Sequence, residues 1–176
     1  GGGGNDTLEG KGGADTLNGQ GGTDTVSYAS SAAGVTVDIG LATAQVSTGD
    51  ASGDILSNFE NLTGSAQADT LTGDTGTNVI FGLAGNDTIE AKGGADTVDG
   101  GAGTDTMAYD SSAARVTVDL GLATAQGGAG DAAGDVLSNF ENLRGSAQAD
   151  ILTGDGNANQ ILAGAGNDTV EGKAGA

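Results

Sequence analysis

The chain has 176 residues and a formal net charge of -19, because 24 Asp and Glu face only 5 Lys and Arg. It contains 36 Gly and no Pro, Cys, His or Trp, and 36% of its residues are hydrophobic. This composition excludes an ordinary globular core, a disulfide scaffold, a thiolate or histidine metal site and, since phosphate binding needs clustered Lys and Arg, nucleic-acid binding. No apolar run approaches the roughly 20 residues of a membrane span.

Residues 1–27 are three nonapeptides, GGGGNDTLE, GKGGADTLN and GQGGTDTVS. Each has Gly at its fourth position, Asp at its sixth and an aliphatic residue at its eighth. The last three residues alternate polar, aliphatic and polar, which predicts a minimal β-strand with one side chain facing inward. The first six form a turn, in which glycine permits backbone conformations with positive φ. Two units therefore predict one coil of a solenoid with two short strands.

Residues 28–63 lose this motif but keep its phase, since they span four nonapeptide lengths, so we expect the solenoid to continue through them. Residues 35–39 alternate strictly and predict a strand longer than the nonapeptide provides. Residues 55–62 are richer in apolar side chains and predict a local core centred on Phe59 and Leu62.

Residues 64–108 return to the motif with five nonapeptides, GSAQADTLT, GDTGTNVIF, GLAGNDTIE, AKGGADTVD and GGAGTDTMA. Residues 109–144 form a second insert, and residues 145–176 hold three further nonapeptides and a truncated fourth. Residues 23–63 and 104–144 match at 30 of 41 positions, which indicates an internal duplication with a period of nine nonapeptides. The sequence predicts an all-β, parallel β-roll or β-helix solenoid with an 81-residue super-repeat.

Four aspartates and two tyrosines of the inserts have two interpretations each. Asp50, Asp54, Asp131 and Asp135 lie in TGDASGD and AGDAAGD, which predict either a solvated loop or an extra, non-standard cation site. Tyr28 and its copy Tyr109 are expected to pack in the interior, with carbohydrate binding as the alternative.

Stacked coils bring the sixth-position carboxylates of neighbouring turns together, a repulsion of about 1 kcal/mol per pair at 4 Å even in water. A hard divalent cation between adjacent turns reverses this effect. Calcium accepts six to eight oxygens from carboxylates and backbone carbonyls, whereas magnesium demands stricter geometry and keeps its waters. Calcium is therefore the cation that we expect.

The repeat resembles the RTX family, the repeats-in-toxin or hemolysin-type calcium-binding repeats. Residues 1–9 match its GGxGxDxUx consensus fully, and residues 100–108 match every fixed position if Met107 counts as aliphatic. The resemblance implies a parallel β-roll with calcium between turns two units apart, held by sixth-position carboxylates and by carbonyls of the second and fourth positions.

Carried onto this chain, the resemblance pairs Asp6 with Asp24, Asp69 with Asp87, Asn78 with Asp96, Asp87 with Asp105 and Asp150 with Asp168. This implies roughly five internal calcium sites, with others near the chain ends. The full set of implied ligands is Asp6, Asp15, Asp24, Asp69, Asn78, Asp87, Asp96, Asp105, Asp150, Asn159 and Asp168, with Gly2, Gly4, Gly13, Gly22, Gly76, Gly85, Gly94, Gly101, Gly103, Gly164 and Gly166.

Three features depart from the family pattern. Asn78 and Asn159 are neutral ligands in place of Asp, which predicts weaker sites. Gln67 and Gln148 occupy the fourth position, where glycine is expected, and predict distorted turns. Asp15 has no motif-bearing partner two units on, because the insert begins at residue 28.

The resemblance implies a module that folds on binding calcium and belongs to a larger bacterial protein, secreted by the type I pathway and extracellular. We expect a monomeric segment of a longer chain with no catalytic residues, because no nucleophile and base pattern occurs. The alternative is a surface-binding solenoid whose outward threonine rows contact a glycan (polysaccharide), another cell surface or ice.

Overall fold

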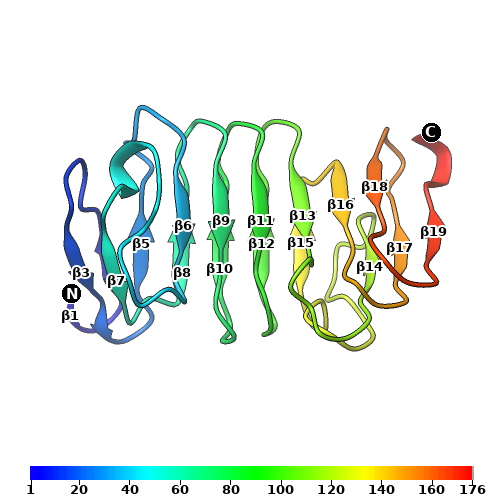
Figure 1. Ribbon diagram of the computed structural model, residues 1–176, viewed down its shortest axis with the longest axis horizontal. Helices are drawn as coiled ribbons and strands as arrows, with labels where there is room; N and C mark the ends of the chain where they lie inside the picture. The colour runs from blue at the N-terminus through cyan, green and yellow to red at the C-terminus, as the bar shows by residue number, and fades with distance from the viewer. Residues whose placement is uncertain (176) are drawn as a thin grey trace.

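The computed structural model describes residues 1–175 as a stack of short parallel strands along one axis, with the two termini at opposite ends (Figure 1). Only two short 3₁₀ helices, η1 (Gly49–Ala51) and η2 (Lys173–Gly175), interrupt the strands and turns in this range. No helix in the described part of the chain is long and apolar enough to cross a membrane.

The strands form two faces, because consecutive strands of the nonapeptide arrays alternate between them. One face holds a six-stranded sheet of β2 (Thr7–Leu8), β5 (Thr25–Ser27), β8 (Asn61–Thr63), β10 (Val79–Phe81), β12 (Thr97–Asp99) and β15 (Val136–Ser138), extended by β14 (Thr117–Asp119), β17 (Ile151–Thr153) and β19 (Thr169–Glu171). The other holds β3 (Thr16–Asn18) and β7 (Ile55–Ser57), then β6 (Thr36–Asp38), β9 (Thr70–Thr72), β11 (Thr88–Glu90), β13 (Thr106–Ala108), β16 (Asn142–Arg144) and β18 (Gln160–Leu162). The short strands β1 (Gly2–Gly3) and β4 (Gln20–Gly21) pair at the edge.

Strand register confirms that two nonapeptides make one coil. Thr70 pairs with Thr88, and Thr88 pairs with Thr106, so each step along the stack takes two units of the repeat. Parallel register places every eighth-position aliphatic side chain above its equivalent in the coil below, and each of them points inward. The core is therefore a column between the two faces, with turns at both edges.

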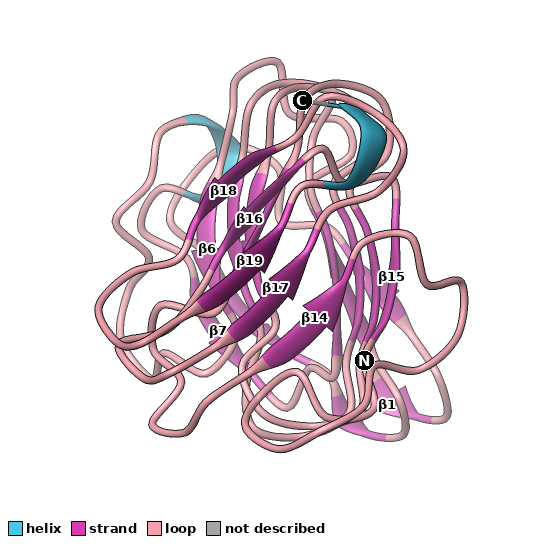
Figure 2. Cartoon of the chain, turned by 90° about the vertical axis from the view of Figure 1, so that its right-hand side faces the viewer, coloured by secondary structure: helices cyan, strands magenta, loops and turns pink. Residues whose placement is uncertain are grey.

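The core column is closed to solvent through most of its length. Leu71, Ile89 and Met107 are fully buried in one face, and Ile80 and Val98 in the other. Seen from the C-terminal end, β15 and β18 lie on opposite sides of the stack and loops surround both (Figure 2). The prediction of a parallel β-roll is thus confirmed.

Each insert changes the order in which strands stack. Strand β5 pairs directly with β8, although four nonapeptide lengths separate Thr25 from its partner Asn61. Of the two strands between them in the sequence, β6 pairs with a later strand, β9, and β7 pairs with an earlier strand, β3. The second insert repeats this with β14 against β17 and β15 against β12. The super-repeat comprises nine nonapeptides, an odd number. Each strand of the second insert therefore lies on the face opposite to that of its equivalent in the first insert.

The expectation of a longer strand at residues 35–39 is wrong. Strand β6 has three residues, like its neighbours, and is the edge strand of its sheet. The Gln45 side chain hydrogen-bonds both backbone groups of Asp38 (2.9 Å each) and so takes the place of a second neighbouring strand. The predicted local core is confirmed, since Phe59 and Leu62 are both buried.

Candidate functional site

The sixth-position side chains form a ladder of hydrogen bonds along each edge of the stack. On one edge, the backbone N–H of Asp69 donates to Oδ1 of Asp87, and that of Asp87 donates to Oδ1 of Asp105 (2.8 Å each). The other three predicted pairs are joined by the same bond, at 2.8 to 2.9 Å: Asp6 with Asp24, Asn78 with Asp96 and Asp150 with Asp168. The structure therefore brings all five predicted pairs together.

Six of these carboxylates have a second oxygen, Oδ2, that is buried and has no hydrogen-bond partner: those of Asp6, Asp15, Asp24, Asp87, Asp96 and Asp105. A buried charged oxygen without a donor is costly, and proteins normally pair it or let it coordinate a cation. All six belong to nonapeptides whose sixth residue is Asp and whose fourth is Gly. Each of these six turns therefore has one carboxylate oxygen with neither a hydrogen-bond donor nor a positive charge to pair with it.

Glycine leaves room for oxygen atoms to converge at these turns. A Cβ added to Gly82 would overlap both Oδ2 of Asp87 and the carbonyl oxygen of Gly100 in the next coil. At the fourth position, Gly94 has a φ of 146°, and a Cβ there would overlap the Gly76 carbonyl oxygen of the coil below. Only glycine lets the turns stack this closely and face one another with bare oxygens.

The predicted carbonyl donors lie in these turns, though not all in one conformation. Among the fourth-position glycines, all but Gly76 have a positive φ: Gly4, Gly13, Gly22, Gly85, Gly94, Gly103 and Gly166. At the second position Gly101 and Gly164 also have a positive φ, whereas Gly2 lies in strand β1.

The donor set suits calcium better than any other common protein metal. No three Asp, Glu, His or Cys side chains of residues 1–175 converge on one point. A cation at these edges would therefore take most of its ligands from backbone carbonyls, with one or two carboxylates. Hard oxygen donors in flexible number are what calcium accepts. The orphaned Oδ2 atoms and the glycine spaces beside them fit this ion.

Burial and mutual repulsion act on the carboxylates within the ladders. Burial, together with the charges of Asp69 and Asp105, raises the pKa of Asp87 to about 6, against the hydrogen bond that it accepts from the Asp69 backbone. Burial likewise raises the pKa of Asp96 to about 6. Keeping these groups ionised at neutral pH costs free energy, which a bound cation offsets.

The first insert supplies the partner that Asp15 was expected to lack. The N–H of Asp15 donates to Oδ1 of Asp54 (2.9 Å), and in the second copy the N–H of Asp96 donates to Asp135 (3.0 Å). Asp54 and Asp135 are fully buried, so the solvated-loop interpretation is wrong for both. Their segments, GDASGDILS at 49–57 and GDAAGDVLS at 130–138, are nonapeptides shifted out of phase, a signal that a fixed register overlooks.

Two glutamates that the sequence analysis missed complete the ladders. The N–H of Asp24 donates to Oε2 of Glu60 (2.7 Å), and the N–H of Asp105 donates to Oε2 of Glu141 (2.8 Å). Both glutamates stand at the sixth position when the nonapeptide phase is carried through the inserts.

Asp50 and Asp131 are half-buried beside these edges, and their binding of a cation stays a prediction.

Tyr28 and Tyr109 pack in the interior, so carbohydrate binding through them is excluded. They are 0% and 1% exposed, and each hydroxyl donates to Oδ2 of a buried aspartate, Asp54 or Asp135 (2.9 Å each). Burial raises the pKa of both phenols and raises the pKa of Asp135 to about 7. These bonds give Asp54 and Asp135 a donor for the oxygen that the six orphaned carboxylates leave unpaired.

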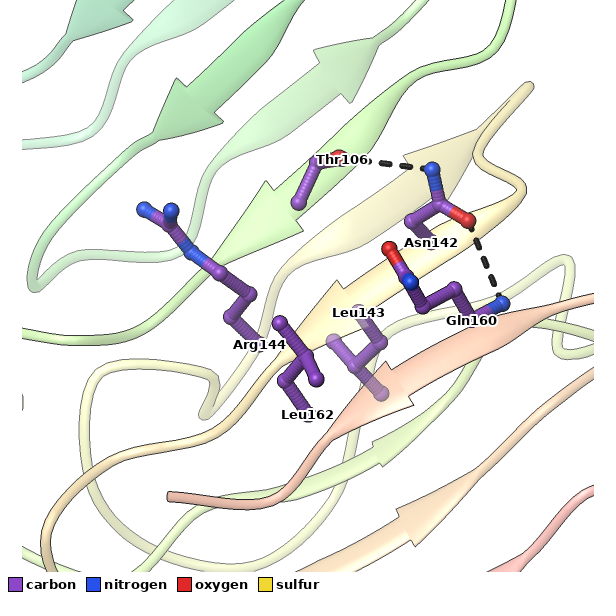
Figure 3. A pocket seen from close by; sticks show the side chains of 6 residues that line it. All are labelled: Thr106, Asn142, Leu143, Arg144, Gln160 and Leu162. Atoms are coloured by element: carbon purple, nitrogen blue, oxygen red, sulfur yellow. Dashed lines mark hydrogen bonds between the residues drawn. The ribbon is translucent and has the colours of Figure 1, made fainter.

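A hollow lined by residues of β13, β16 and β18 has no acidic side chain in its lining (Figure 3). Arg144 and Leu162 lie at one end, and the Asn142 amide lies between Thr106 and Gln160. Arg144 forms an ion pair with Asp110. The hollow is chemically distinct from the acidic edges and is not a cation site.

Comparison with known families agrees with this geometry. The family model described as RTX calcium-binding nonapeptide repeat matches the chain in four copies, over residues 1–30, 57–89, 72–107 and 138–176. These ranges cover the nonapeptide arrays almost completely and leave out the middle of each insert. A search of the curated proteins gives no significant match.

Proposed function

The chain belongs to the RTX calcium-binding nonapeptide repeat family, and we propose that it is a module whose β-roll folds on binding calcium within a larger secreted bacterial protein. The observation that carries this proposal is the set of six buried Oδ2 atoms without a partner. Repeats of this family typically occur in secreted bacterial proteins. Calcium binds the edges, and its binding free energy becomes folding free energy because the sites exist only in the stacked state.

The charge of the chain supports a role linked to secretion. At a net charge of -19, the calcium-free chain repels itself and resists compaction. Such a chain stays extended where calcium is scarce, passes through a type I exporter and folds outside the cell. In this proposal the module is structural, a monomeric segment without catalytic residues.

Isothermal titration calorimetry of the metal-free chain with calcium and with magnesium tests the binding step. We expect saturable calcium binding with more than one ion per chain, and weak or no binding of magnesium, because magnesium gives up its waters reluctantly. Absence of calcium binding at millimolar concentration would refute the proposal.

A second candidate function is contact with a polysaccharide or cell surface through an outer sheet face. The hollow at Asn142 and Gln160 favours it, because amide and hydroxyl groups beside Leu162 suit a polar ligand with some apolar surface. Ice binding is less favoured, because the outward threonine row of the first face is broken at Asn61 and Val79. Binding of the calcium-loaded chain to a glycan array, reduced by Gln160→Ala, tests this candidate.

A further inference from the structure

Ten of the eleven complete nonapeptide turns in the three arrays fall into two structural classes, and the turn of Asp168 belongs to neither. In the six turns that end at Asp6, Asp15, Asp24, Asp87, Asp96 and Asp105, the sixth-position side chain has an unpartnered Oδ2, and we name these open turns. In four others, which begin at residues 64, 73, 145 and 154, the second-position residue bonds the sixth-position side chain, and we name these capped turns.

Serine closes one type of capped turn. The Ser65 N–H donates to Oδ2 of Asp69 (2.6 Å), and the Ser65 hydroxyl and the Val35 N–H donate to its Oδ1 (2.8 and 2.7 Å). In the second copy, Ser146 and Val116 donate the equivalent hydrogen bonds to Asp150. Both carboxylate oxygens thus have donors from the protein, and neither is left buried without a hydrogen-bond partner.

An Asp and Asn pair closes the other type. The Asp74 N–H donates to Oδ1 of Asn78 (2.9 Å), while the Asn78 amide donates to Oδ1 of Asp74 (3.1 Å) and to the Glu60 carbonyl (2.8 Å). Asp155 and Asn159 repeat the pattern. The neutral Asn that the sequence analysis treated as a weakened ligand is therefore part of a closed, hydrogen-bonded turn.

The backbone at the second position separates the two classes. Its φ is positive in five of the six open turns: 61° at Lys11, 75° at Gln20, 80° at Leu83, 66° at Lys92 and 93° at Gly101. Gly2, in the first turn of the chain, is the exception. In the capped turns, Ser65, Asp74, Ser146 and Asp155 have no positive φ, and their N–H groups point at the sixth-position side chain.

The classes alternate with the 81-residue period. Open turns fill residues 1–27 and 82–108, and each insert together with the two capped nonapeptides after it forms a block, 28–81 or 109–162. Within the described residues of these blocks, every sixth-position side chain of the ladder accepts at least one protein hydrogen bond, and no Asp or Glu oxygen there is buried without a partner.

We propose that calcium binds only at the open turns, at up to six sites, and that the blocks 28–81 and 109–162 are metal-free spacers closed by their own side chains. This inference rests on the proposed calcium function and revises its site list: Asp69, Asn78, Asp150 and Asn159 are structural capping residues. The open triplets bind cations as two separated clusters, one super-repeat apart in sequence.

The test compares two members of one predicted pair in the full chain. Calcium retained per chain is measured by equilibrium dialysis and elemental analysis for the parent, Asp87→Asn and Asp69→Asn. We expect about six ions for the parent, a loss of at least one ion in Asp87→Asn, and no loss in Asp69→Asn. Ser65→Ala, a milder change that removes one hydroxyl bond to Asp69, is expected to keep the full ion count and to lower the thermal midpoint.

Loss of a calcium ion in Asp69→Asn while Ser65→Ala keeps the full count, or a parent count near the number of all sixth-position residues, would overturn the inference while leaving calcium binding intact. A parent chain that retains no calcium would instead refute the proposed function. If Asp69→Asn fails to fold, Asp150→Asn, the matched change in the second copy, decides in its place, because Ser65→Ala keeps the Asp69 carboxylate and therefore tests folding only.

Discussion

At the scale of the residue, the chemistry of the edges depends on which carboxylate oxygens have a hydrogen-bond donor. Oδ2 of Asp87 is buried with none, whereas Oδ2 of Asp54 accepts a hydrogen bond from the Tyr28 hydroxyl. The two aspartates occupy equivalent places in their ladders, yet only Asp87 lacks a protein donor for this oxygen, and we expect a cation only there. Chemistry at the edges is thus decided by single donors, each of which a substitution can remove.

Tyr28→Phe is expected to destabilise the calcium-loaded chain by about 1–3 kcal/mol, because it leaves Oδ2 of the buried Asp54 without its donor. Urea denaturation in saturating calcium measures the change. Tyr109→Phe is the matched substitution in the second copy, and a similar loss there is expected. Unchanged stability in both variants would show that these hydroxyl bonds contribute nothing.

Gly94→Ala is expected to destabilise the calcium-loaded chain by at least about 1–2 kcal/mol, because the residue has a φ of 146° and its new Cβ would overlap the Gly76 carbonyl. Gly127→Ala is the control, since no atom lies within 4 Å of a Cβ at that position. The thermal midpoints of both variants measure the difference. Equal midpoints would contradict the close stacking of turns described above.

At the scale of the element, each nonapeptide joins a three-residue strand to a turn that carries charge. The strand buries one aliphatic side chain, such as Ile89. The inserts differ, because they add Tyr28 and Phe59 to the core and replace part of the edge ladder with Asp54 and Glu60. Apolar packing and edge chemistry are therefore distributed unevenly along the stack.

Phe59→Ala is expected to cost about 3–5 kcal/mol, because Phe59 is 4% exposed and its removal leaves a cavity in the insert core. Phe81→Ala is the control, since Phe81 is 41% exposed on the outer face, and it is expected to cost less than about 1 kcal/mol. Urea denaturation in calcium compares the two. A larger loss of stability in Phe81→Ala than in Phe59→Ala would contradict the position of Phe59 in the core.

Without calcium, the folded chain is expected to gain stability as the pH falls from 7 towards 4. Burial raises the folded-state pKa of Asp87 and Asp96 to about 6, above the ordinary value of 3.8, so the folded state binds more protons than the unfolded state in this range. Asp69 and Asp105 flank Asp87, and Asp74, Asp131 and Asp135 lie around Asp96. The calcium-free fold therefore loses this contribution as the pH rises through 6.

Far-UV circular dichroism in EDTA at pH 7 and pH 5 measures this effect. We expect a larger β-sheet signal at pH 5, and no comparable gain in saturating calcium, where protonation competes with the metal. A calcium-free signal that is unchanged or smaller at pH 5 would contradict the role assigned to carboxylate repulsion.

Much of the fold could be predicted from the sequence, because a repeat of nine residues is compatible with few arrangements of strands and turns. The Gly, Asp and aliphatic positions of units such as 1–9 predicted the turn, the ladder and the core, and the five predicted pairs lie together in the structure. The roles of Asp54 and Glu60 did not follow, because they depend on how β6 and β7 exchange their places in the stack. Long-range strand order of this kind leaves no local periodic signal.

At the scale of the whole molecule, the chain is a solenoid whose apolar column is narrow and whose edges are acidic. The buried side chains of Leu71, Ile80 and Leu143 define the column, and the ladders of carboxylates define the edges. Because the super-repeat makes four and a half coils, the two inserts lie on opposite faces, and the pattern of open and capped turns repeats with the same period. Stability in such a stack is a sum over neighbouring coils, so we expect ions bound at the edges to determine whether the stack persists.

We expect this stack to require calcium at neutral pH. Far-UV circular dichroism and thermal unfolding of the full chain, chelated and then titrated with calcium or magnesium, test it most directly. We expect a largely disordered spectrum in chelator, a cooperative β-sheet signal on adding millimolar calcium and little change with magnesium. A chelated chain that keeps its full β-sheet signal and its melting temperature at pH 7 would contradict it.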